Sequence, residues 1–212
     1  MRIASLASDK TSPTDSLPIR RFASEHDWAA WLERNHDRSP GLWLQIAKKG
    51  ANVASVSYPE ALDVALCYGW IDGQKRAQSD TFWLQKFGRR TKTSLWSRIN
   101  REKALALVAA GRMRPPGMKE MRRAKADGRW KGAYDSARAA TVPEDLERAL
   151  KRNAKARRFF AALDRANRYA ILFRLQTAKK AETRARRLAD FLEMLEGGRK
   201  IHEVPRKRRP YP

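Results

Sequence analysis

Two short stretches of the chain concentrate the side chains that could do chemistry. The first, ALCYGWIDGQKR at residues 65–76, places an aspartate among aromatic residues and glycines. The second, RRTKTSLWSRIN at residues 89–100, contains arginines, hydroxyl side chains and an asparagine. Carboxylates can act as general bases, whereas guanidinium and hydroxyl groups bind phosphate or carboxylate. These residue types are compatible with either an active site or a pocket for an anion.

Asp72 is the candidate base in the first stretch, between Ile71 and Gly73 at the start of a predicted hairpin. Its short side chain could bond backbone amides at a turn. It could instead pair with Arg89 or Arg90 if the second strand of the hairpin returns to its side. A general base would need a raised pKa, and the many neighbouring cations would lower the pKa of Asp72. We therefore favour a structural role over a catalytic one.

The second stretch favours anion binding. Ser94 is expected to cap a helix, and the free backbone amides at a helix start attract phosphate or carboxylate. Arg89 and Arg90 precede this expected helix start, and Ser97 and Asn100 would follow close to the same face. Backbone amides, hydroxyls and guanidinium groups would then meet in one place.

Tryptophans could add aromatic walls to such a site. If the helices pack back on the hairpin, Trp70, Trp96 and Trp130 could line a cleft suited to a nucleotide, a sugar phosphate or single-stranded nucleic acid. Most of the seven tryptophans are better explained as core residues, and Trp96 and Trp130 stay open. The candidate ligand-binding residues are Asp72, Arg89, Arg90, Ser94, Trp96, Ser97, Asn100, Arg129 and Trp130; the candidate nucleic-acid contacts are Lys92, Arg206, Lys207, Arg208 and Arg209.

Metal and nucleophile chemistry have little support in the sequence. Its three histidines, His26, His36 and His202, do not have metal-ligand spacing, and its single cysteine, Cys67, lies in an apolar stretch typical of a buried thiol. The sequence contains neither a nucleophile elbow nor a phosphate-binding glycine loop. We therefore expect no metal and no cofactor, and we favour a non-enzymatic protein.

Charge is the most unusual property of the 212-residue chain, which has a formal net charge of +23. Residues 1–85 are electrically balanced, whereas residues 86–131 contain 15 basic and 3 acidic side chains, and residues 143–212 contain 20 and 9. Such a surface attracts phosphates and anionic lipids, although arginine can also simply solvate helix faces.

The sequence contains no apolar run typical of a signal peptide or a membrane span, so we expect a cytoplasmic protein without integral membrane association.

The first part of the chain predicts a small α+β domain. Residues 1–19 are expected to be disordered, and a helix should begin after Ser24. Residues 41–49 alternate like a strand, and Ser57 with Glu60 forms a capping box for a helix that Gly69 ends. A hairpin should follow. We expect three strands in a small antiparallel β-sheet, with helices, over residues 20–131.

From Ser94 onward, including the last part of this domain, the chain is predicted to be mostly α-helical. Gly111 and Gly128 should end two helices, and Thr141 with Glu144 has capping-box spacing. In the last helix, apolar residues recur at helical spacing at Leu188, Phe191, Leu192 and Leu195. Residues 199–212 are expected to form a basic mobile tail.

Six segments, in a specific order between Phe22 and Gly198, carry a family resemblance: WAAWLERNH, GLWLQIAKK, YPEALDVALCYGWIDG, RRTKTSLWSRIN, AGRMRPPGMKEMRRAKADGRW and AKKAETRARRLADFLEMLEGG. Together they resemble the YdeI/OmpD-associated family of bacterial proteins, also called bacteriocin-protection proteins. The last segment and the helix before it resemble the family's C-terminal helical module, expected over residues 141–198. The chain departs from the family at Gly88, where a proline usually precedes the first arginine of RRTKTSLWSRIN.

The resemblance implies a link to resistance against cationic antimicrobial peptides and to an outer-membrane porin, without an established reaction. Direct capture of a cationic peptide conflicts with the net charge of +23, so protection would be indirect.

Three functions fit these observations. We favour a non-enzymatic cytoplasmic protein, with a role in binding or stress resistance, whose partner is a nucleic acid or an anionic small molecule. An enzyme of unknown reaction on a phosphorylated or carboxylated small molecule would use Asp72, Arg90, Ser94, Ser97 and Asn100. A scaffold with a protein partner is the third.

Overall fold

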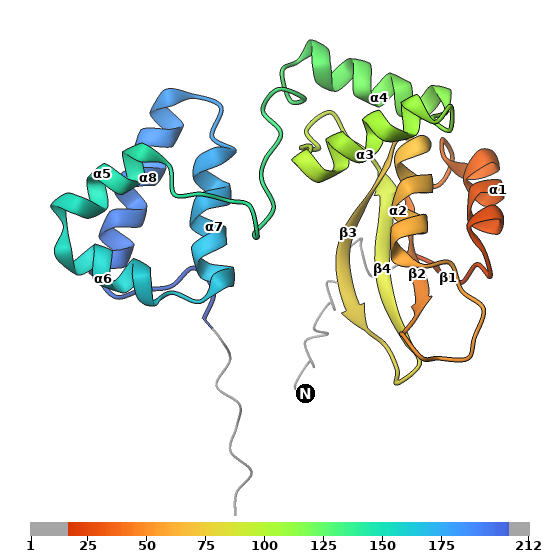
Figure 1. The fold of residues 1–212 in the computed structure, drawn as a ribbon, viewed down its shortest axis with the longest axis horizontal. Coiled ribbons are helices and arrows are strands. Elements are labelled where there is room, and N and C mark those ends of the chain that lie inside the picture. Colours follow the sequence, from red (N-terminus) through yellow and green to blue (C-terminus); the bar gives the residue numbers. More distant parts are fainter. Residues whose placement is uncertain (1–16, 204–212) are drawn as a thin grey trace, which may run out of the picture. The chain divides into compact units, whose positions relative to one another are not determined.

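The computed structural model describes residues 17–203, which form two compact units (Figure 1). The N-terminal unit comprises residues 17–94 and 100–130, and the C-terminal unit comprises residues 95–99 and 131–203. The expectations for residues 1–16 and 204–212, including those for Arg206, Lys207, Arg208 and Arg209, lie outside the described residues. No helix between residues 17 and 203 is both long and apolar enough to cross a bilayer.

The N-terminal unit contains a four-stranded sheet of order β1-β2-β4-β3. Its strands are β1 (Ile19–Arg20), β2 (Gly41–Ala47), β3 (Trp70–Ala77) and β4 (Phe82–Arg89). Strand β4 pairs antiparallel with β2 and β3, but β1 pairs parallel with β2, so the expected antiparallel sheet is in fact mixed. The α1 crossover between β1 and β2 makes a parallel pairing possible. Strand β1 begins at Ile19, within the segment expected to be disordered.

Two helices supply much of the core on the sheet, α1 (Glu25–Asn35) and α2 (Tyr58–Cys67). The predicted caps are confirmed: the Ser24 side chain accepts a hydrogen bond from the Asp27 N–H, and Ser57 opens α2 with a capping box. The indole of Trp28 is fully buried and lies 6.1 Å from the ring of Trp70, centroid to centroid. Trp70 is therefore a core residue and does not line a cleft.

Two more helices follow the sheet, α3 (Arg98–Ala109) and α4 (Pro115–Ala126). The expectation that Ser94 caps a helix is wrong, because α3 begins only at Arg98. The Ser94 hydroxyl instead accepts a hydrogen bond from the Thr91 N–H at 2.9 Å. Serine hydroxyls readily form such local turns, which compete with helix caps. The helix start that was expected to attract an anion at Ser94 therefore does not exist.

The C-terminal unit packs four helices, α5 (Glu144–Arg152), α6 (Ala154–Ala162), α7 (Arg165–Gln176) and α8 (Ala181–Glu196), around their own apolar core. The predicted apolar face of α8 is confirmed, since Phe191 and Leu195 are buried. The predicted capping box at Thr141 does not form: Pro143 occupies the N-cap position. After α8, Ile201 packs against the core, so the chain stays attached to the helices at this point.

An ion pair ties the start of α5 to the start of α8. The guanidinium of Arg184 donates two hydrogen bonds to the Asp145 carboxylate, at 2.7 and 2.9 Å. These hydrogen bonds hold the pKa of Asp145 below its ordinary value. A carboxylate with a lowered folded-state pKa stabilises the fold above its unfolded pKa, and this contribution is lost as the pH falls through the lowered value.

We expect Asp145→Asn to lower the free energy of unfolding of the C-terminal unit by about 1–3 kcal/mol at neutral pH, because it removes a charge-assisted pair. Urea unfolding followed by helical circular dichroism measures the change. Glu144→Gln is the matched control, since Glu144 is almost fully exposed and its pair with Arg148 contributes little. The difference between wild type and Asp145→Asn should shrink in strong acid. Equal losses of unfolding free energy for the two variants would contradict a stabilising role for the Asp145–Arg184 ion pair.

Candidate functional site

A groove of about 780 Å³ opens in the N-terminal unit between the C-terminal ends of α2 and β4 and helix α4. We call it the basic groove, because its lining contains five cations and two carboxylates: Arg89, Arg90, Lys119, Arg122 and Arg123 against Asp37 and Glu120. The remaining lining comes from backbone and from uncharged or aromatic side chains such as Tyr68 and Pro116. Its size is in the range of pockets that hold small molecules.

The β4 side of the basic groove is held by backbone contacts. Arg89 Nη1 donates to the carbonyl oxygen of Asp37 at 2.8 Å, and the Arg90 N–H donates to the carbonyl oxygen of Gly69 at 3.1 Å. Arg90 is only 6% exposed. A Cβ at Gly88 would lie 3.2 Å from the carbonyl oxygen of Pro40, so glycine permits a close approach of the two backbones.

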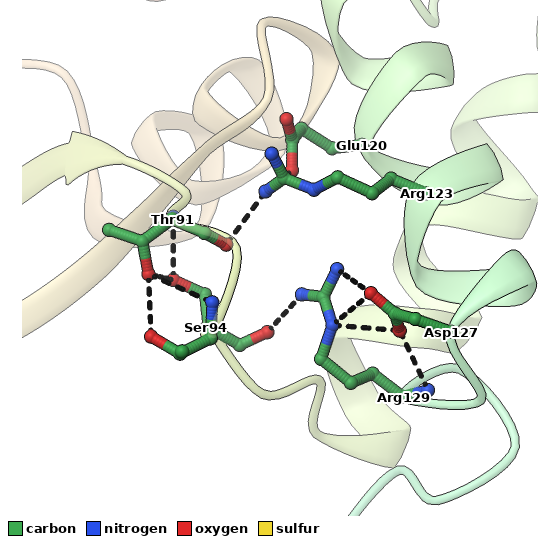
Figure 2. A network of polar contacts seen from close by, with 7 residues as sticks. Thr91, Ser94, Glu120, Arg123, Asp127 and Arg129 are labelled. Atoms are coloured by element: carbon green, nitrogen blue, oxygen red, sulfur yellow. Dashed lines mark hydrogen bonds and ion pairs between the residues drawn. The ribbon is translucent and has the colours of Figure 1, made fainter.

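Helix α4 forms the opposite side. Lys119, Arg122 and Arg123 lie at i, i+3 and i+4, so they share one face of the helix. Arg123 pairs with Glu120, and its Nη2 donates to the carbonyl oxygen of Thr91 at 2.7 Å (Figure 2). Arg123 thereby attaches α4 to the chain that leaves β4, whereas Lys119 and Arg122 are exposed to solvent.

Arg129 has a structural role that the sequence did not reveal. It is 2% exposed, and its Nε donates to both carboxylate oxygens of Asp127, at 2.8 and 2.9 Å. Its Nη1 donates to the carbonyl oxygen of Ser94 at 2.6 Å (Figure 2). The carboxylate of Asp127 therefore neutralises the guanidinium, which ties the loop at Ser94 to the end of α4 and does not line the basic groove.

The other candidate residues of the N-terminal unit also lie outside the groove lining. Asp72 accepts a hydrogen bond from the Tyr58 hydroxyl at 2.8 Å, which agrees with a structural role. Asn100 is buried, and the Trp130 ring lies 5.5 Å from Lys125 Nζ. Lys92 is exposed in the loop that follows β4.

Two candidates belong to the C-terminal unit. Trp96 is 2% exposed and is a core residue. Ser97 forms an isolated β-bridge with Tyr134. Of the residues singled out in the sequence as ligand-binding, only Arg89 and Arg90 therefore come together in the basic groove.

The sequence reasoning missed the α4 cations that complete the groove. Their signal was present in MKEMRRAK, where basic residues recur on one helix face. Such a basic face usually only solvates a helix, so the spacing alone could not distinguish a solvated face from one that lines a groove. What distinguishes them is the approach of α4 to the end of β4, which is a tertiary contact.

Two groups near the groove are unsuited to acid–base or nucleophilic chemistry at neutral pH. Burial raises the pKa of the Cys67 thiol to about 11, as expected for a structural cysteine. Burial, together with the hydrogen bond that its hydroxyl donates to Glu33, raises the pKa of Tyr68 to about 12. Among residues 17–203, no three His, Cys, Asp or Glu side chains gather in a group that could hold a metal ion.

Comparisons with known families divide the chain into two parts. Residues 20–120 match the model of a domain of unknown function (DUF8412), which includes most of the basic groove. Residues 139–198 match the model described as bacteriocin-protection, YdeI or OmpD-associated. No curated protein and no solved structure shows a significant match to the chain. The resemblance seen in the sequence is thus confirmed for its C-terminal part: the chain carries a domain of the YdeI/OmpD-associated family at residues 139–198.

Proposed function

We propose that the protein is a non-enzymatic cytoplasmic binding protein whose N-terminal unit holds a phosphate- or carboxylate-bearing ligand in the basic groove. The excess of cations over carboxylates in the groove lining is the observation that carries this proposal. A cleft lined by charge of one sign concentrates the field inside it and attracts the opposite charge.

The roles of the cations differ within this proposal. Arg89 and Arg123 are fixed by backbone carbonyls and hold the two sides of the groove. Lys119 and Arg122 are exposed on α4 and contact the ligand first. Fixed guanidinium groups can donate to two oxygens of a phosphate or carboxylate at once, and little freedom is lost on binding.

The ligand chemistry could come from a small phosphorylated molecule or from a nucleic-acid backbone. Isothermal titration of the full chain with pyrophosphate, with ATP and with a single-stranded oligonucleotide distinguishes them. If the groove binds the phosphate backbone of the oligonucleotide and three cations neutralise phosphates, a plot of log affinity against log salt concentration should have a slope of about −2. Binding of ATP or pyrophosphate without the oligonucleotide would identify a small ligand. No binding of any of the three at low salt would contradict the proposal.

In this proposal, any protection against bacteriocins is indirect and does not involve binding of the peptide itself. A chain with a net charge of +23 repels a cationic peptide, so the ligand of the basic groove, and not the peptide, is what the protein holds.

A further inference from the structure

A second groove, of about 520 Å³, lies wholly within the C-terminal unit, between α6 and the C-terminal end of α8. Its lining is mostly apolar, with Phe159, Ala162 and Leu195, and charged side chains occupy its rim. We call it the apolar groove. It has no residue in common with the basic groove, so an inference from it does not depend on the function proposed above.

The helical repeat of α6 builds one wall of the apolar groove. Lys155, Phe159 and Ala162 recur at i, i+4 and i+7 and so lie on one face, whereas the next residue, Phe160, is buried in the core. Phe159 remains half-buried. After α8 the chain passes beside its ring at Gly198, where even a Cβ would lie 3.8 Å from Phe159 Cε2. Phe159 lines the groove, and Gly198, which has no side chain, places none over its ring.

The charges on the rim favour one sign of partner. Glu196 accepts a hydrogen bond from Asn153 Nδ2 at 3.2 Å, so its carboxylate is already engaged. Lys155 and Arg158 are exposed one helical turn apart on α6. Residues 131–203 contain 18 basic and 10 acidic side chains, which adds a wider positive field.

We propose that the apolar groove docks an amphipathic acidic peptide segment of a partner protein. The peptide places a large apolar side chain over Phe159 and Ala162 and sets its carboxylates against Lys155 and Arg158. A groove between two helices with an apolar floor is the arrangement that receives one face of an amphipathic helix. A nucleic acid would satisfy the cations and leave the apolar floor unfilled.

Two synthetic peptides of equal length and equal negative charge test this proposal with the full chain. One alternates glutamate pairs with leucine pairs, and the other replaces each leucine with serine. Fluorescence anisotropy of the labelled peptides, at a salt concentration of about 0.15 M, reports binding while long-range attraction is screened. We expect the leucine peptide to bind and the serine peptide to bind about tenfold more weakly or not at all, a difference of about 1.4 kcal/mol.

Two neighbouring substitutions at the end of α6 provide the matched variants. Ala162→Glu places a carboxylate at the apolar groove, whereas Ala161→Glu makes the same change at an exposed position that does not line it. We expect the first to weaken binding of the leucine peptide about tenfold and the second to leave it within about twofold. Circular dichroism confirms that both variants keep their helices.

Three outcomes would overturn the proposal. Equal binding of the two peptides would show that charge alone acts. Equal losses for Ala161→Glu and Ala162→Glu would place the binding elsewhere. Sedimentation showing that wild type self-associates and that Ala162→Glu prevents it would assign the groove to a second copy of the chain.

Discussion

Replacing Gly117 with alanine is expected to lower the free energy of unfolding of the N-terminal unit by about 3 kcal/mol or more, as overpacking against rigid backbone does. A Cβ at this position would lie 2.4 Å from the carbonyl oxygen of Cys67 and 2.6 Å from that of Leu66. Both atoms belong to the backbone at the end of α2, which cannot yield as a flexible side chain could. Helix α4 can approach α2 closely only because residue 117 has no side chain.

Gly73→Ala is the matched control, because a Cβ there would meet only the flexible side chain of Lys86 at ordinary contact distances. We expect a change within about 0.5 kcal/mol for this variant. Urea unfolding followed by tryptophan fluorescence measures both, since Trp28 and Trp70 report the core of the N-terminal unit. Wild-type stability for Gly117→Ala would show that α4 does not depend on this close contact.

The same contact links stability to the basic groove. Helix α4 contributes Lys119 and Arg122 to one side, and the end of α2 contributes Tyr68 and Gly69 to the other. A shift of α4 away from α2 would widen the space between these cations and Arg90. Gly117→Ala should therefore also weaken anion binding in whatever fraction of the protein remains folded.

Reversing two charges on α4 is expected to have the largest effect on ligand binding. The double variant Lys119→Glu, Arg122→Glu replaces the two exposed cations that α4 contributes to the groove with carboxylates that repel the ligand. If each reversal costs about tenfold, the affinity for pyrophosphate or the oligonucleotide falls about 100-fold at low salt, or about 2.8 kcal/mol. Isothermal titration measures this loss, which should diminish as salt screens the charges.

The control for this variant is Lys48→Glu, Lys49→Glu, which makes the same change in net charge at exposed positions of the same unit outside the groove. The affinity of this control variant for the same anions should stay within about twofold of wild type, because the change in overall charge alone has only a small effect. Similar losses for the two double variants would mean that overall charge, and not the basic groove, controls binding.

Much of the local structure could be predicted from neighbouring residues. Ser24 and Ser57 cap their helices as expected, because a cap depends on a side chain and backbone amides two or three residues away. The buried face of α8 follows from the helical repeat of its apolar residues. The family resemblance of residues 139–198 was likewise visible in the sequence.

The failures concern one contact between distant residues and one choice among competing local hydrogen bonds. Strand β1 is only two residues long and pairs with residues 43 and 44, so its direction depends on a crossover that local pattern does not encode. Ser94 was expected to cap a helix, yet its hydroxyl is taken by Thr91. Several short-range hydrogen-bonding options compete at such a serine, and the surrounding packing selects among them.

By itself the sequence determined the excess of positive charge, the positions of most helices and strands, and the presence of an arginine pair at the end of β4. Only the tertiary structure decided which cations act together. It places the carboxylate of Asp127 against Arg129. It also brings the α4 cations close to Arg89 and Arg90, because Gly117 lets α4 pack closely on the end of α2. The reason is that Coulomb interactions depend on distance and burial, and neither can be obtained from spacing along the chain.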